Sequence, residues 1–274
     1  MNIRIPQKNK IMNTIILMII SIIWLVPIAM VIMNVFKTKI EFNLGNLWLP
    51  PKDLKNISEN IKLCIDNKIF ISFGSSLLYC GVGTIVGVFL AMLAGFGLTH
   101  TTIRHKVFWF LVIYSGTIFP FEIYLIPIFR MYKFTGLYNT RFGMMIFWCA
   151  LIIPFAMFVF RNFFLGIDNE ICESAKMDGA NNFQILFYIL APMAKAPIAI
   201  LLLQQFSASW NDLMFGLTFT KSAEIRPVMV TLSLMGTQNP PARFLGCIIV
   251  SVPTMILFFV LRNQLEAGFS YSVK

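Results

Sequence analysis

The hydrophobic pattern of the chain consists of six long apolar segments separated by polar ones. The apolar segments lie at residues 11–36, 70–98, 107–130, 142–164, 195–219 and 245–262. Each is close to the length of about 20 residues that an α-helix needs to cross the hydrocarbon core of a bilayer. Because lipid offers the backbone no hydrogen-bond partners, a segment that crosses the hydrocarbon core outside a closed β-barrel has to be helical. The pattern therefore predicts an all-α membrane protein with six transmembrane helices.

Two of these segments have distinctive internal sequences. The third contains Pro120 and Pro127, and proline breaks or bends a helix. The second carries small residues that would let a neighbouring helix approach closely. They are Gly74, Ser75, Gly81, Gly83, Gly87, Ala91 and Gly95.

The polar connections differ in length and character. Residues 37–69, 131–141 and 220–244 would lie on one side of the membrane, and 99–106 and 165–194 on the other. We expect some local structure in 220–244, and a polar loop outside lipid in 37–69. The basic residues before the first segment resemble the start of a signal peptide, but the apolar run is about twice as long as a typical signal-peptide core. We therefore expect an uncleaved first span.

Composition supports a membrane protein and excludes several other classes. Of 274 residues 58% are hydrophobic and only 12% charged, whereas soluble domains have about 25% charged residues. The net charge is +10, but the basic residues are scattered and form no basic face, so we expect no nucleic-acid partner. Both flanks of the first segment are basic, so the positive-inside rule leaves the orientation undecided.

The sequence contains no recognisable set of residues for catalysis or metal binding. The five cysteines have no metal-ligand spacing, and His100 and His105 have no neighbouring carboxylate, so we expect no metal site. No Walker A pattern is present, and the glycines of residues 81–87 lie inside a span. We therefore expect a non-enzyme without a cofactor of its own.

Polar side chains inside two spans are candidates for a translocation pathway. Such groups normally face the interior of the bundle or a water-filled cavity. Amides and carboxylates hydrogen-bond to hydroxyl-rich ligands, and aromatic rings stack on their apolar faces. Interhelical hydrogen bonding is the alternative role for the same side chains. The candidates are Glu122 in the third span and Gln204, Gln205, Trp210, Asn211 and Asp212 in the fifth.

Residues 165–194 contain a short motif with regular spacing. Glu173-Ser174-Ala175 is followed after three residues by Gly179, and after nine more by Ile189-Leu190-Ala191-Pro192. The residue types predict a helix over 169–180, capped by Asp168 or Asn169 and ended by Gly179. Pro192 would permit a new helical start. We expect a short rigid helix that lies along the membrane surface between two spans.

This spacing resembles the EAA loop of the permease subunits of bacterial ABC importers, with Ser174 and Ala191 as departures from the pattern. Asp178-Gly179-Ala180 is similar to the carbohydrate branch of that family. Four further stretches resemble the same branch and occur in the expected order, so the likeness covers nearly the whole chain. They are residues 126–140, 153–164, 207–217 and 265–274. The subunit they resemble is similar to the smaller permease of the maltose system.

The resemblance implies a type I ABC importer permease (MetI-like) fold and a set of partners. The short helix would be a coupling helix in the cytoplasm that docks on a separate ATPase dimer, which holds ATP and magnesium. Other implied partners are a second homologous permease, an extracellular sugar-binding protein and a carbohydrate substrate, as an oligosaccharide or glycoside. The implied location is the bacterial plasma membrane with both termini cytoplasmic. The implied coupling residues are Glu173, Ser174, Ala175, Asp178, Gly179, Ala180 and Pro192.

A different class of transporter remains open at this point. An ion-coupled secondary transporter would work without an ATPase and would use Glu122 as its proton carrier. It would not need a helix that protrudes from the membrane surface.

Overall fold

The structure is a computed structural model that describes residues 7–45, 47–235 and 239–271. Over these residues the regular structure is helical, from α1 (Gln7–Asn34) to α14 (Pro240–Tyr271). The chain forms two compact units. The first comprises the residues up to Ile69 together with 234–250, and the second comprises 70–233 together with 251–274.

The first unit combines a long apolar helix with a group of short helices. α1 exposes its apolar side chains from Ile11 to Ile28, as expected for a helix that faces lipid or another chain. After it come α2 (Lys39–Asn43), the 3₁₀ turn η1 (Leu54–Asn56) and α3 (Ile57–Asp66). The buried Asn60 of α3 donates to the carbonyls of Val35 and Lys37, at 2.7 and 3.1 Å. The predicted polar loop 37–69 therefore contains helices, and a buried amide ties them to the end of α1.

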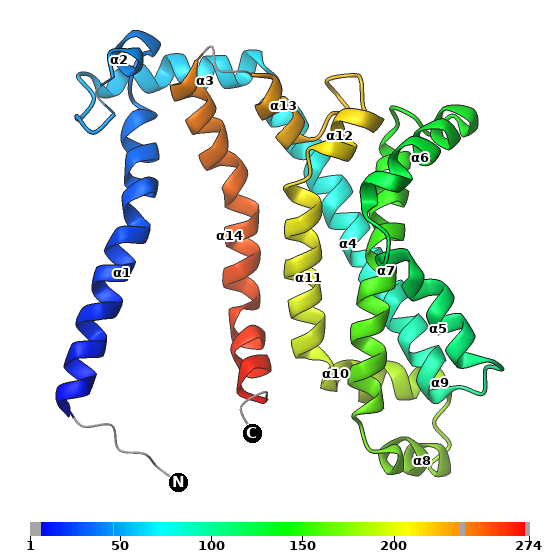
Figure 1. Ribbon diagram of the computed structural model, residues 1–274. Helices are drawn as coiled ribbons and strands as arrows, with labels where there is room; N and C mark the ends of the chain where they lie inside the picture. Colours follow the sequence, from blue (N-terminus) through cyan, green and yellow to red (C-terminus); the bar gives the residue numbers. More distant parts are fainter. Residues whose placement is uncertain (1–6, 46, 236–238, 272–274) are drawn as a thin grey trace. The chain divides into compact units, whose positions relative to one another are not determined.

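The second unit holds most of the helices and the main core. Its long elements are α4 (Ile69–His100), α7 (Arg141–Leu165) and α11 (Lys195–Trp210). The α8–α10 segment lies at one end of α7 and α11, and α6, α12 and α13 lie at the other (Figure 1). The shorter elements are α5 (Lys106–Tyr114), η2 (Ser115–Thr117), α6 (Phe121–Thr135), α8 (Asn169–Met177), α9 (Asn182–Gln184), the π-helix η3 (Ile185–Leu190), α10 (Ala191–Met193), α12 (Met214–Phe219) and α13 (Val228–Leu234).

Glycines on one face of α4 allow close contact with α7. A Cβ atom built on Gly83 would lie 2.9 Å from Trp148 Cβ, and one built on Gly95 would lie 2.9 Å from Phe160 Cβ. Gly87 is similarly close to Ile152, at 3.1 Å. Gly74 and Gly81 have no atoms within 4 Å of an added Cβ. Of the small residues predicted to permit close packing, Gly83, Gly87 and Gly95 therefore pack against α7, whereas Gly74 and Gly81 face open space.

Among the residues that the structure describes, four helices are long and apolar enough to cross a membrane, and up to six spans result if each of two bent helix pairs counts as one. The four are Ile11–Asn34, Ile69–His100, Arg141–Leu165 and Pro240–Glu266. The first three match the predicted first, second and fourth segments within two residues at each end, and the last contains the predicted sixth segment and extends beyond it at both ends. The predicted class, an all-α protein that crosses the membrane several times, is confirmed.

The other two predicted spans, 107–130 and 195–219, are not straight helices. In the third, residues Lys106–Thr117 and Glu122–Thr135 meet at 95°, and the break falls at Pro120. Pro127, by contrast, lies inside α6 without ending it. In the fifth, α11 ends at Trp210, and α12 starts at Met214. Between the two helices, Asp212 accepts hydrogen bonds from Phe215 N and Gly216 N in the first turn of α12 and so stabilises the start of that helix.

The connections on either side of these spans are also more helical than predicted. α6 extends to Thr135, so the expected turn 131–141 begins inside a helix. The expected loop 220–244 contains α13 and the first turn of α14, in line with the local structure predicted there. The sixth helix starts at Pro240, five residues before its predicted start, because proline is well tolerated in the first turn of a helix.

Candidate functional site

The short helix α8 lies in the connection between α7 and α11, where the spacing motif was found. Asp168 caps it, because its Oδ1 accepts a hydrogen bond from Glu170 N at 3.1 Å. At the other end Gly179 has a φ of +86°, which glycine adopts without steric cost. Ala180 N then donates to Ala175 O at 2.9 Å, which closes the helix end. The capping residue and the stop were predicted correctly, but α8 ends at Met177 and not at residue 180.

The two faces of α8 have different surroundings. Cys172 and Ala175 are buried in the main core of the second unit, together with Phe160 and Phe164 of α7 and Leu186 of η3. Burial raises the pKa of the Cys172 thiol, so this face carries no charge at neutral pH. On the opposite face Glu173, Ser174, Lys176 and Asp178 are exposed, and Met177 is 88% exposed. The helix is thus attached to the core on one side and open on the other.

The segment after α8 connects it to α11 through a sharp bend. Asn181 and Gln184 form a capping box, with Gln184 N donating to Asn181 Oδ1 at 2.9 Å and Asn181 N donating to Gln184 Oε1 at 2.8 Å. Residues Asn182–Met193 and Lys195–Trp210 meet at 77°. Pro192 is exposed in the short α10 before this bend. Asp178, Gly179 and Ala180 line a shallow pocket together with Gln184, Tyr188 and Ile189.

Two of the candidate pathway residues have clear structural roles at the end of α11. Trp210 is only 2% exposed, and its ring lies 5.4 Å from that of Phe206 and 5.4 Å from that of Phe73. Asp212 accepts hydrogen bonds from Gly216 N at 3.0 Å and Phe215 N at 3.3 Å. These contacts lie within the fold and shape the junction between α11 and α12.

The remaining candidates are accessible. Gln204 and Asn211 are exposed, and Gln205 is half-buried. The amide of Asn211 donates to Ser207 O at 2.8 Å. Glu122 is exposed in the first turn of α6, on a different element from the others. The structure thus places the amides on one helix end and the carboxyl group elsewhere.

A row of hydroxyl groups on α4 holds the segment that leads from α12 into α13, and this role was not predicted from the sequence. Ser75 Oγ donates to Glu224 O at 2.8 Å, Tyr79 Oη donates to Ile225 O at 2.9 Å, and Ser76 Oγ accepts from Val228 N at 2.8 Å. Ser72 and Thr231 share a further hydroxyl contact at 2.6 Å. The spacing of residues 72, 75, 76 and 79 on one helical face was the available signal.

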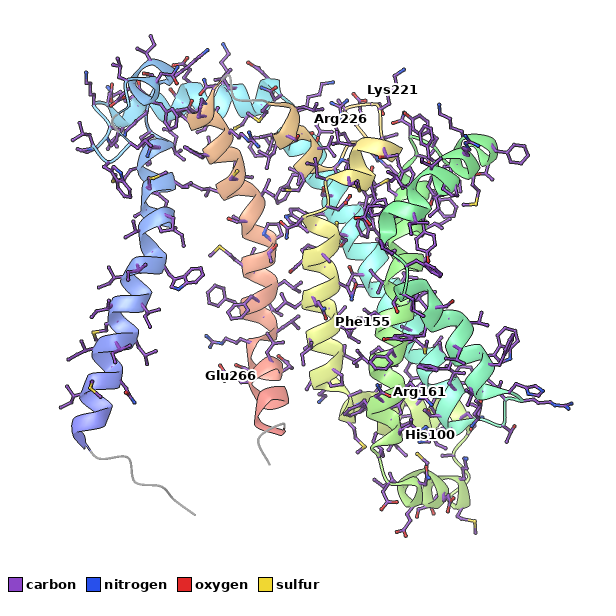
Figure 2. The ribbon with its side chains drawn as sticks, viewed as in Figure 1. His100, Phe155, Arg161, Lys221, Arg226 and Glu266 are labelled. Atoms are coloured by element: carbon purple, nitrogen blue, oxygen red, sulfur yellow. The ribbon has the colours of Figure 1, made fainter. Side chains whose placement is uncertain are left out.

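Asn139 fixes the same segment from the other side. Its Oδ1 accepts from the backbone N–H groups of Lys221 and Ser222, at 2.7 and 3.0 Å, and its own N–H donates to Phe219 O at 2.9 Å. Figure 2 shows Lys221 and Arg226 on this segment, at the end of the second unit opposite His100 and Arg161. The segment is therefore a shaped surface and not a loose loop.

The described residues include no group of three or more His, Cys, Asp or Glu side chains that could hold a metal ion. The candidate features are thus an exposed helix, the amides at the end of α11 and a fixed segment.

Sequence relatives include sugar permeases named for different substrates. The chain is 28% identical to the lactose transport system permease protein LacG of Rhizobium radiobacter over 207 residues, which cover 74% of each chain. It is 25% identical to the arabinooligosaccharides transport system permease protein AraQ of Halalkalibacterium halodurans over 261 residues, covering 91% of this chain and 90% of the relative. A probable ABC transporter permease of Pyrococcus horikoshii is 32% identical over 158 residues, which span 57% of this chain and 58% of the relative.

A solved structure shares the fold. A bacterial ABC transporter involved in the import of the acidic polysaccharide alginate contains a chain that superposes with a TM-score of 0.76. The match covers 94% of this chain and 96% of that one, at 24% sequence identity. The type I permease fold implied by the resemblance is therefore confirmed.

A match to a family model shows to which protein family the chain belongs. The model described as the binding-protein-dependent transport system inner membrane component matches residues 83–271, well over half of the chain. The match includes α8 and the segments on both sides of it. The resemblance to carbohydrate ABC-importer permeases, seen first in five short stretches, is thereby confirmed. This chain belongs to the family of binding-protein-dependent transport system inner membrane components, and it is a multi-pass membrane permease.

Proposed function

We propose that this permease imports a carbohydrate, an oligosaccharide or a glycoside, delivered by an extracellular binding protein. The relatives named for lactose, arabinooligosaccharides and alpha-glucosides support this substrate class. Their substrates differ from one another, so they support the class and not one particular sugar.

One observation carries the proposed mechanism: α8 is rooted in the core by Cys172 and Ala175 and exposes its other face. We propose that this outer face docks on an ATPase dimer, which holds ATP and magnesium. Closure of the ATPase dimer would displace α8, and the close packing of its inner face would pass that displacement to α7 and η3. The spans would then alternate between inward-open and outward-open arrangements.

The same proposal includes the orientation and the other partners. With α8 in the cytoplasm, an even number of spans places both termini there as well. The segment held by Asn139 and by the hydroxyl groups of α4 would then be extracellular. Its fixed shape supports a role as a contact surface for the binding protein. A second homologous permease would complete the pathway.

For the pathway itself we propose roles of two kinds. Gln204, Gln205 and Asn211 are accessible amides and would hydrogen-bond to sugar hydroxyl groups, with Glu122 as a further accessible group. Trp210 and Asp212 would hold the end of α11 in the shape that presents these amides. This division follows from burial and contacts alone.

The coupling role is tested by ATP-driven sugar uptake in vesicles that hold the complete importer. Gly179→Ala forces a side chain into the left-handed conformation, and Asp178→Ala removes the carboxyl group before it. We expect each variant to lower uptake per ATP hydrolysed. Gly45→Ala is the matched control, because Gly45 has a φ of +85° and open space but lies far from α8 in the sequence. Unaltered coupled uptake in both Gly179→Ala and Asp178→Ala would overturn the proposal.

The ion-coupled alternative is tested in the same vesicles. A secondary transporter would show uptake driven by a proton gradient with this chain alone, and Glu122→Gln would abolish it. The ABC-importer proposal expects no uptake by this chain alone and ATP-dependent uptake after addition of the partners.

A further inference from the structure

Arg161 is a charged residue inside α7, a helix long enough to cross a membrane. The central carbon of its guanidinium group lies 4.4 Å from the centre of the Phe110 ring of α5. Phe110 stacks on Tyr114 with ring centres 5.4 Å apart, and Tyr114 stacks on Phe158 of α7 at 4.9 Å. A cation over an aromatic face is held by electrostatic attraction to the ring. The contact between α5 and α7 therefore fixes the position of this charge, which Figure 2 shows near the α8 end of the second unit.

The N–H groups of Arg161 lack an acceptor within the described part of the chain. The contact of its guanidinium there is with the Phe110 ring, and no carboxylate, carbonyl or hydroxyl group accepts a hydrogen bond from it. Arginine carries five N–H donors in a fixed fork. The side chain is half-buried, but none of its nitrogen atoms is fully enclosed. These donors are therefore available to an anion from outside the chain.

A second cation lies on the same side of α5. Lys106 is one helical turn before Phe110, so the two side chains share a face of the helix. Lys106 Nζ donates to Thr99 O at 2.9 Å, which holds the ammonium group at the start of α5 and uses one of its three donors. Residues 99–115 and 153–165 contain no Asp or Glu. The groove between α5 and α7 is therefore positively charged at this end, without an acidic side chain from either segment.

The depth of these two cations matches that of lipid phosphate groups. Arg161 lies four residues before the end of α7, which corresponds to about 6 Å along the helix axis. The polar layer of a bilayer is about 5–7 Å thick on each side. Trp109 precedes Phe110 and is 48% exposed, and tryptophan is enriched at this level of the membrane. Beside it α5 exposes apolar side chains, namely Val107, Phe108, Leu111 and Val112.

We propose that Arg161 and Lys106 form a binding site for a phosphate group, and that an anionic phospholipid supplies this group. The guanidinium would bind two phosphate oxygens through parallel hydrogen bonds, and the ammonium group would add a third contact. The acyl chains would lie along the exposed apolar side chains of α5.

The bound lipid would fasten α5 to α7 from the membrane side. Phe110 packs against the core cluster that contains Cys172 and Ala175 of α8. Occupation of the site would therefore stabilise the part of the fold that supports α8. The inference goes beyond the proposed transport function and does not depend on it, because the site uses only residues of this chain and lipid.

Lipid binding at this site is measured by quenching of Trp109 fluorescence with phospholipids that carry brominated acyl chains. The purified chain is placed in bilayers of phosphatidylcholine mixed with phosphatidylglycerol, and either lipid is brominated in turn. The chain contains five tryptophans, so the difference between the unmodified protein and Trp109→Phe isolates the signal of Trp109. The ratio of the two quenching efficiencies gives the preference of the site for the anionic lipid.

Four variants test the roles of the two cations. Arg161→Gln removes the guanidinium, whereas Arg161→Lys keeps the charge and loses the planar fork. Lys106→Gln removes the second cation. Lys195→Gln is the matched control, because it removes another exposed cation at the same end of the second unit, on α11.

We expect the unmodified chain to prefer phosphatidylglycerol by about tenfold, the effect of one hydrogen bond between charged groups. Arg161→Gln should abolish the preference, and Arg161→Lys and Lys106→Gln should each retain part of it. Lys195→Gln should match the unmodified chain. The midpoint of thermal unfolding without lipid separately reports any loss of the stacking between Arg161 and Phe110.

Thermal unfolding in a neutral detergent distinguishes a lipid headgroup from a free phosphate ion. Phosphatidylglycerol should raise the unfolding midpoint of the unmodified chain and not that of Arg161→Gln, whereas inorganic phosphate should raise neither. An increase with inorganic phosphate alone that Arg161→Gln removes would overturn the assignment to lipid and leave a site for a free phosphate group.

Two results would overturn the site itself: no preference for phosphatidylglycerol at Trp109 in the unmodified chain, or the same preference in Arg161→Gln. If Arg161→Gln does not fold, equal preferences in Arg161→Lys, Lys106→Gln and the unmodified chain would reject it. None of these measurements involves an ATPase, a binding protein or a sugar, so failure here leaves the proposed transport function untouched.

Discussion

Asn139 shows how much one side chain can determine in this protein. It adopts a φ of +57°, which asparagine tolerates better than most residues. Its Oδ1 accepts from Lys221 N, Ser222 N and Ser222 Oγ. One residue therefore satisfies several polar groups of a segment about 80 positions away in the sequence. No local pattern in the sequence marks it, because its partners Phe219, Lys221 and Ser222 are all distant in the sequence.

Replacement of Asn139 should therefore loosen residues 220–227. We expect Asn139→Ala to destabilise the protein by about 1–3 kcal/mol, because two backbone N–H groups lose their acceptor and alanine is strained at positive φ. Asn139→Asp keeps the acceptor and should stay close to the unmodified protein. Thermal unfolding in detergent measures the stability, and tryptic cleavage after the exposed Lys221 reports the release of the segment. Equal cleavage of both variants would contradict this role.

The α4–α7 contact shows which features of the helices can be predicted from the sequence and which cannot. The hydrophobic pattern is sufficient to predict the long helices, because 20 apolar residues in lipid have few alternatives to a helix. The small residues of α4 predict close packing, but not which glycine faces which helix. That depends on the rotation of α4 about its own axis, which distant contacts such as Ser72 with Thr231 set.

The same substitution at two glycines of α4 should have opposite effects. Gly95→Ala places a Cβ 2.9 Å from Phe160 Cβ, so α4 and α7 must move apart, and we expect a loss of about 1–3 kcal/mol. Gly81→Ala meets no atom within 4 Å and should raise stability by about 0.5–1 kcal/mol through the better helix propensity of alanine. Unfolding of the purified chain in detergent distinguishes them. A decrease of the same size in both variants would show that packing against α7 is not the cause.

The breaks at Pro120 and at residues 211–213 show the limit of this approach. Proline was recognised in the third span, but its consequence, a bend of 95°, was not, and Pro127 causes no break at all. Residues 211–213 were predicted to lie inside the fifth span, yet α11 ends before them and Asp212 stabilises the start of a new helix there. Whether a polar residue ends a helix or binds a ligand depends on the geometry of its neighbours, which composition does not specify.

At the scale of the whole molecule, the shape of the connection that carries α8 was predictable from the sequence, whereas the arrangement of the pathway candidates was not. The loop carries a fixed spacing of Glu173, Gly179 and Pro192, and its cap and stop follow from local chemistry. The pathway candidates share only polarity inside an apolar segment. In the structure they divide into buried supports such as Trp210 and accessible amides such as Gln204. No local sequence pattern identifies which sugar the permease would carry.

The proposed orientation makes a prediction about the whole molecule in its membrane. Met177→Cys and Lys221→Cys introduce thiols at two exposed positions, one on α8 and one on the segment held by Asn139. A membrane-impermeant maleimide should label Lys221→Cys in intact cells and Met177→Cys only in inverted vesicles, in a chain whose five native cysteines have been replaced. Labelling of both from the same side would contradict an odd number of spans between them.

The two faces of α8 finally bear on how such a protein can change. Cys172 and Ala175 pack against side chains of the same polypeptide, so a replacement at either position changes core packing and therefore stability. The outward-facing residues are Glu173, Met177 and Asp178. A replacement there would change only the contact with a docked partner. Mutations on the outer face can therefore accumulate without cost to folding. Under the proposed coupling role, grafting the outer residues of a related permease onto α8 should redirect this permease to another ATPase while its substrate stays the same.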